Sequence, residues 1–196
     1  ADVTPTVAPD AVAPEPAPDS RPEDRSALSA AMKAARTATM EGKFDAAMNE
    51  LKKVASVPKS PEQQAKYDRL SLMAQYADNF RSALRESLAA LEAGDEIEVG
   101  ANKTVGVVGT TANSITVRVS GVNRTYSVDT MPTGLAVAIA DTWLRKEDSV
   151  SLAMKGAYVA TRKDADAQQL DKARQWLQEA SSKDRDMADL EKVLDD

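Results

Sequence analysis

The side chains most often used for catalysis and metal binding are scarce in this chain of 196 residues. It contains no histidine and no cysteine, so the commonest general base, the commonest zinc ligand and the thiolate nucleophile are all missing. Carboxylates lie close together in three places, Asp95 and Glu96, Glu147 and Asp148, and Asp164 and Asp166. General acid–base catalysis needs two carboxylates in different environments facing one cleft. Because these pairs lie at expected helix ends, we expect capping and helix-dipole roles, with no catalytic residue, metal or cofactor.

A few basic and aromatic residues are the candidates for binding a ligand. Arg118, Arg124 and Tyr126 fall in a segment of alternating apolar and polar residues, and Lys103 precedes them. On a small sheet these side chains can form a basic face with one aromatic ring. A small-ligand or glycan-binding site on that face is therefore one hypothesis for function, and exposed charges kept only for solvation are the alternative.

The distribution of charge bears on the partners that the chain can have. The net charge is −6, of which residues 1–25 contribute −4 and residues 183–196 contribute −3, so the remaining body is nearly neutral at +1. A nucleic-acid partner would require a basic stripe that displaces counterions, and we expect none. The longest apolar run, residues 135–140, is far shorter than the roughly 20 residues that cross a bilayer, so we also expect no membrane span.

Residues 1–21 differ in composition from the rest of the chain. Proline, alanine, valine and acidic residues alternate there without a period that could bury an apolar face. This composition predicts a disordered tether rich in Pro and Ala. The sequence begins with Ala1 rather than Met, which favours a removed signal peptide and hence a periplasmic or secreted protein, the alternative being a trimmed end.

Helical patterns occupy residues 22–93. Ser20 precedes Pro22 and Glu23, and Ser60 precedes Pro61 and Gln63, so each serine is a predicted N-cap. The first helix is predicted to run to about Met40, and a second one covers residues 44–55. The third begins at Pro61, and its pattern leaves open whether the chain turns at residues 78–79 or continues to residue 91.

The period changes from helical to strand-like over residues 94–129. Four short runs of alternating Val and Ile are separated by turn residues, and Gly106 and Gly109 inside one run predict bulges or bends. Four strands in so short a segment predict a small antiparallel module, either a barrel similar to SH3 domains or a bent sheet.

Helices return over residues 130–196. Pro132 suits a first helical turn, and the next helix is expected to bury Leu135, Ile139 and Trp143 on one face. Two further helices are predicted at residues 149–162 and 166–181. The charged segment 184–194 is predicted to dock over the helix that carries Trp176 or, alternatively, to mediate self-association.

One spacing occurs three times in the helical regions. A large residue at Phe44, Phe80 or Leu170 is followed three positions later by Ala47, Ala83 or Ala173, and the small alanine allows another helix to approach closely. This pattern, with Gly42-Lys43-Phe44 as the turn and Gly156-Ala157-Tyr158 as part of a first helix, resembles the tetratricopeptide repeat. The resemblance implies a surface for binding a peptide or protein. The strand segment resembles modules of uncharacterised exported bacterial proteins.

We therefore expect an α+β, mainly α fold in which antiparallel helix pairs flank an inserted β-module. The expected function is a non-enzymatic interaction or scaffold protein that binds a protein partner or a second copy of itself. The alternative is ligand or glycan binding through Arg118, Arg124 and Tyr126.

Overall fold

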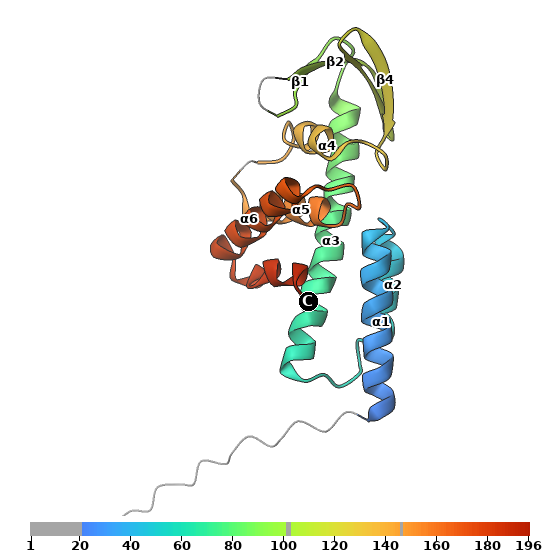
Figure 1. Cartoon of the computed structure of the whole chain (residues 1–196), viewed down its shortest axis with the longest axis vertical. Coiled ribbons are helices and arrows are strands. Elements are labelled where there is room, and N and C mark those ends of the chain that lie inside the picture. Colours follow the sequence, from blue (N-terminus) through green and yellow to red (C-terminus); the bar gives the residue numbers. More distant parts are fainter. Residues whose placement is uncertain (1–20, 101–102, 146) are drawn as a thin grey trace, which may run out of the picture.

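One long helix organises the molecule. The structure, a computed structural model, describes residues 21–100, 103–145 and 147–196. Helix α3 (Pro61–Ala90) runs along the long axis, with two N-terminal helices beside its first half and a small sheet beyond its end (Figure 1). The C-terminal helices pack on the other side of α3. The fold is thus α+β and mainly α, as the sequence predicts.

The N-terminal helices form a hairpin that packs on α3. Helix α1 (Pro22–Met40) is followed by Gly42, whose φ of +70° favours glycine, and then by α2 (Phe44–Lys53). Ser60 caps α3 as predicted, through a reciprocal pair of hydrogen bonds with Gln63. Arg21 occupies the N-cap of α1 without a side-chain cap bond, and Ser20 lies outside the described residues.

The sequence left open whether the chain turns at residues 78–79 or stays helical, and in the structure α3 is one unbroken helix there. It continues through them, because Ala77, Phe80 and Leu84 extend its buried face toward the sheet. The second copy of the repeated spacing, at Phe80 and Ala83, therefore lies in the second half of α3 and does not form a separate helix. Two helix hairpins remain, α1–α2 and α5–α6.

The strand region is an open antiparallel meander rather than a barrel. Its strands are β1 (Glu96–Glu98), β2 (Thr104–Thr111), β3 (Ser114–Val119) and β4 (Val122–Ser127), paired in sequence order. Among the described residues β1 does not pair with β4, so the expected barrel is wrong and the bent sheet is right. The register of β2 shifts between Val107 and Gly109, which is the predicted bulge.

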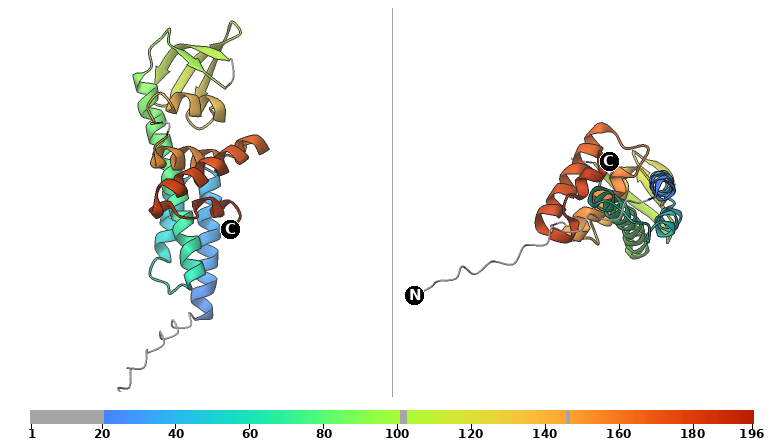
Figure 2. Two further views of the ribbon diagram at one scale, coloured as in Figure 1. Left: turned by 90° about the vertical axis from the view of Figure 1, so that its left-hand side faces the viewer. Right: turned by 90° about the horizontal axis from the view of Figure 1, so that it is seen from below.

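The C-terminal helices begin beside the sheet. They are α4 (Thr133–Ala140), α5 (Ser149–Ala160) and α6 (Ala167–Lys183). Figure 2 shows α4 beneath the sheet and α6 extending sideways from α3. Pro132 is the N-cap of α4. Helix α4 ends at Ala140, so Trp143 does not lie on its apolar face as predicted but is 56% exposed in the loop that follows.

The contact between α5 and α6 depends on one glycine. A Cβ atom at Gly156 would lie 2.7 Å from Cγ of Leu177 and 3.1 Å from the carbonyl oxygen of Ala173. These distances are shorter than ordinary van der Waals contacts, so only glycine fits without movement of α6. Ala173, the small residue of the third copy of the repeated spacing, is fully buried, and its backbone oxygen faces Gly156 in this contact.

The last residues dock on the body, as predicted. Two short 3₁₀ helices, Arg185–Met187 and Leu190–Leu194, bury Met187, Leu190 and Val193. Met187 and Leu190 join an apolar cluster with Leu177 of α6. Arg69 of α3 holds Asp196 through two hydrogen bonds of 2.8 and 2.9 Å. This C-terminal segment (residues 184–196) therefore links α6 to α3.

Candidate functional site

A large hollow lies between the two helix hairpins. This interhelical groove encloses about 690 Å³ and is bordered by α1, α3, the end of α5 with the loop after it, α6 and the C-terminal segment. Leu70, Met73, Ala160 and Val193 form a buried apolar floor. Two more exposed apolar side chains lie at its walls, Met40 at 38% and Leu170 at 40% exposed.

The lining of the interhelical groove carries more cations than carboxylates, although ion pairs with Asp164 and Asp195 offset the charges of Arg162 and Arg174. Its lining contains four cationic side chains and one carboxylate, namely Arg36, Arg162, Lys163, Arg174 and Asp171. Arg36 donates to the carbonyl oxygen of Val193. Arg174 pairs with Asp195 through two bonds of 2.8 and 2.9 Å. Several of these cations are thus fixed in place at the edge of an apolar surface, in a chain whose net charge is −6.

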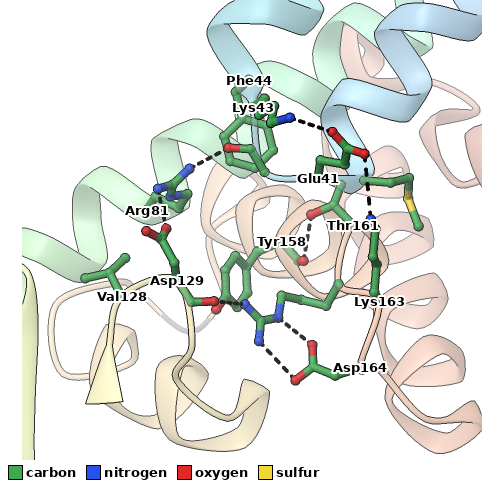
Figure 3. Close-up of a pocket in the computed structure, with 13 residues that line it drawn as sticks. Glu41, Lys43, Phe44, Arg81, Val128, Asp129, Tyr158, Thr161, Lys163 and Asp164 are labelled. Atoms are coloured by element: carbon green, nitrogen blue, oxygen red, sulfur yellow. Dashed lines mark hydrogen bonds and ion pairs between the residues drawn. The ribbon is translucent and has the colours of Figure 1, made fainter. Parts of the chain in front are cut away.

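A second, more polar hollow adjoins the groove and shares Met40, Thr161, Arg162 and Lys163 with it. This polar cavity has a volume of about 460 Å³ and lies where the α1–α2 turn, α3, the β4–α4 loop and the end of α5 meet (Figure 3). It contains four cationic side chains and three carboxylates, which are Lys43, Arg81, Arg162, Lys163, Glu41, Asp129 and Asp164.

Backbone carbonyl groups hold both arginines of the polar cavity. Arg81 donates to the carbonyl oxygen of Gly42 at 2.6 Å and pairs with the carboxylate of Asp129. Arg162 donates to the carbonyl oxygens of Asp129 and Met131 at 2.9 and 3.2 Å. The guanidinium groups therefore tie α3 and α5 to the loop after the sheet and keep fixed positions.

The carboxylates of the polar cavity pair with its cations but remain more exposed than the arginines. Asp164 pairs with Arg162 at 2.7 Å, and the side chain of Asp164 is 55% exposed against 16% for Arg162. The hydrogen bond from Arg162 lowers the pKa of Asp164. Lys43 and Lys163 share one carboxylate, Glu41, at 2.8 and 3.9 Å. The hydrogen bond from Lys43 lowers the pKa of Glu41.

Tyr158 is the aromatic residue of the polar cavity. Its ring stacks on Phe80 with centroids 4.2 Å apart, and the residue is 3% exposed, so the side chain packs in the core. Its hydroxyl group is buried without a hydrogen-bond partner among the described residues, as is Nε of Arg81. Burial raises the pKa of Tyr158, so the hydroxyl group stays protonated and can donate.

The residues proposed from sequence as ligand-binding candidates do not share one face of the sheet. Arg124 is paired with Val117 and Tyr126 with Ile115, so both project to the side of those buried valine and isoleucine residues. Arg118 is paired with Asn123 on the opposite side, where its Nε donates to the Asn123 side chain at 3.1 Å. Tyr126 packs partly on the main core. None of the three borders the groove or the polar cavity.

The sequence analysis did not identify the two arginines that meet at the polar cavity. Arg81 and Arg162 are 81 positions apart, and no local spacing connects them. Two signals in the sequence lay nearby, Gly42 as part of a turn and Tyr158 as part of a helix in the repeat resemblance. The adjacent carboxylates behave partly as expected, since Asp148 caps α5 and Asp166 caps α6. No group of three or more acidic residues suited to a metal ion occurs in residues 21–100, 103–145 and 147–196.

Comparison with known proteins found no relative of this chain. The chain matches no family model, no curated protein and no solved structure. Within the part of the chain that the structure describes, none of the helices has the length and apolar character needed to cross a membrane.

Proposed function

We propose that this chain is a non-catalytic binding protein and that its interhelical groove receives an acidic segment of a partner protein. The observation that supports the proposal is the combination of a buried apolar floor with a rim of four cations and one carboxylate. Protein-binding sites typically place an apolar centre inside a polar rim. The sign of the rim charge selects a partner segment that carries carboxylates beside apolar residues.

The walls of the groove suit a polypeptide rather than a small compact ligand. The groove is bordered by residues from several separate elements, and Met40 and Leu170 lie on different helices at its edges. Both are well exposed for large apolar side chains, and an apolar contact with a partner would bury them. Ligand binding on the sheet face has less support, because Arg118 lies on the side opposite Arg124 and Tyr126.

The experiment is affinity purification from the native source with wild-type protein and single variants. Leu170→Glu and Met40→Glu place a negative charge in the groove, and both should lose the partner that wild-type protein retains. Val150→Glu is the matched control, because Val150 is 40% exposed, as Leu170 is, but lies outside the groove. Equal capture by all four proteins would contradict the proposal, and so would loss through Val150→Glu alone.

A further inference from the structure

The end of the C-terminal segment lies beside α3 (Figure 1), between two hollows of the molecule. The smaller hollow, of about 240 Å³, is lined by α1 and α3, and it shares Arg36 and Val193 with the interhelical groove. Asp196 also borders the smaller hollow, and Leu194 borders the groove. Residues 193–196, which we call the latch, therefore separate two spaces that would otherwise form one longer groove.

One arginine from each of three helices binds the latch, namely Arg36 of α1, Arg69 of α3 and Arg174 of α6. The first donates to the carbonyl oxygen of Val193. The other two each bind a carboxylate through paired hydrogen bonds of 2.8 and 2.9 Å, which is Asp196 for α3 and Asp195 for α6. Paired bonds between a guanidinium and a carboxylate select geometry as well as charge. The walls of the groove therefore recognise two successive carboxylates.

The apolar residues of the latch lie over the floor of the groove. Val193 is 4% exposed and belongs to the same apolar cluster as Met73 and Ala160. Leu194 packs on that cluster but is only partly buried. The latch thus presents two apolar residues followed by two carboxylates, which is the chemistry that we propose for the partner segment. The chain's own latch shows one way in which such a segment binds.

The latch is held less firmly than the residues that precede it. Met187 and Leu190 are buried in the cluster around Leu177, and they fix the C-terminal segment without help from the latch. The latch has a hollow on either side, and the side chains of its Arg174–Asp195 pair are 38% and 67% exposed, so solvent screens their attraction. Segments with few buried contacts and exposed hydrogen bonds open at low cost. The latch can therefore open while Met187 and Leu190 stay in place.

We propose that the latch is an intramolecular stand-in for the partner segment, and that the partner binds by displacing it. The partner segment then has two adjacent apolar residues followed by two carboxylates, in the order found in the latch. Its apolar pair takes the places of Val193 and Leu194, and its carboxylates bind Arg69 and Arg174. Displacement also joins the two hollows, which gives the partner a longer surface. The inference rests on the function proposed above, because it describes how the same groove is occupied.

A peptide added to the full chain tests the latch. The probe is a fluorescein-labelled peptide with the sequence of residues 191–196, and fluorescence anisotropy is measured as protein is added up to millimolar concentration. The double variant Asp195→Asn/Asp196→Asn weakens the latch but keeps the arginines. It should bind the peptide about tenfold or more tightly than wild type, in which the attached latch competes at a high effective concentration. Glu96→Gln/Glu98→Gln removes two charges from exposed positions of β1 and should bind like wild type.

Two further variants test the apolar and the basic contacts separately. Val193→Ala weakens the latch without changing a charge, and it should also raise the affinity for the peptide. Arg174→Gln changes a side chain that is 38% exposed, so the fold should be retained. It removes a group that both the latch and the peptide need, so it should bring no gain in affinity. The proposal is overturned if the double variant and Val193→Ala both bind the peptide like wild type, or if Arg174→Gln binds it as tightly as the double variant.

The peptide result is independent of capture from the native source. Tighter peptide binding by the double variant, together with equal capture by wild type and Leu170→Glu, would overturn the proposed function and support the latch. Loss of a captured partner through Leu170→Glu, with no gain in peptide affinity in the double variant, would overturn the latch alone. Dimers of the double variant in light scattering, in place of peptide binding, would identify a second copy as the occupant and would also overturn the proposal.

Discussion

Gly156 allows the packing of α5 on α6 to be tested with a single methyl group. In the variant Gly156→Ala the new Cβ would lie 2.7 and 2.8 Å from Cγ and Cδ2 of Leu177 and 3.1 Å from the backbone oxygen of Ala173. Ordinary contacts between carbon atoms lie near 3.5–4.0 Å. Leu177 is fully buried against Met187 and Leu190, so it has no open space into which it can move.

Two opposing effects set the magnitude for Gly156→Ala. Overpacking of a filled core costs about 1–3 kcal/mol. Replacing glycine by alanine inside a helix stabilises by about 1 kcal/mol. Because one of the short distances is to a backbone atom, we take the upper part of the overpacking range and expect a net loss of about 1–2 kcal/mol in the free energy of unfolding.

Urea unfolding with a matched control measures this loss. Gly134 lies in α4, and a Cβ there would meet only Cγ1 of Val99 at 3.8 Å, an ordinary contact. The same substitution, Gly134→Ala, should therefore be neutral or stabilising. In a Leu177→Ala background, Gly156→Ala should destabilise less, because the close side-chain atoms are gone and only the 3.1 Å approach to the backbone oxygen of Ala173 remains. The packing account is refuted if Gly156→Ala stabilises the chain as much as Gly134→Ala does.

Three other variants test separate parts of the structure. Leu190→Ala should lower the free energy of unfolding by about 2–5 kcal/mol, because Leu190 is 0% exposed in the cluster that anchors the C-terminal segment; urea melts unchanged within about 0.5 kcal/mol would show that the segment does not dock. Burial raises the pKa of Tyr158 above its ordinary value of 10.0, so as pH rises past 10 the phenol ionises first in the unfolded chain and stability falls. Tyr158→Phe should remove that loss in melts between pH 8 and about 11, and an alkaline limb equal to that of wild type would contradict the burial of the hydroxyl. Trp143→Ala should change stability by less than about 1 kcal/mol, since the ring is 56% exposed, and a larger loss in urea melts would place Trp143 in the core.

Local patterns in the sequence predicted most of the fold. The cap at Ser60, the alternation in residues 94–129 and the turn at Gly42 each depend on residues close together in the chain, and each is found. The end of α4 was misplaced because Trp143 continues the helical spacing of Leu135 and Ile139, although the helix stops at Ala140. The sequence could not decide between a closed barrel and an open sheet. Closure depends on pairing between the first and last strands, and local alternation does not report on that pairing.

Local sequence patterns could not predict the candidate site, because its residues are far apart in the chain. Arg81, Asp129 and Arg162 come from three elements separated by 48 and 33 positions, and they meet only because α3 continues past residues 78–79 to the sheet. Arg118 and Arg124 were grouped because they lie close in sequence. Cross-strand pairing with Asn123 and Val117 nevertheless puts them on opposite sides of the sheet.

Site-specific crosslinking in the native source can show whether the interhelical groove contacts a partner protein. A photoreactive phenylalanine analogue placed at Leu170 is compared with the same analogue at Val150, which is equally exposed at 40% but lies outside the groove. We expect a discrete crosslinked protein from position 170 that is absent from position 150, and charge reversal of the rim by Lys163→Glu should reduce it. Identical products from both positions, or none from position 170, would contradict such a contact.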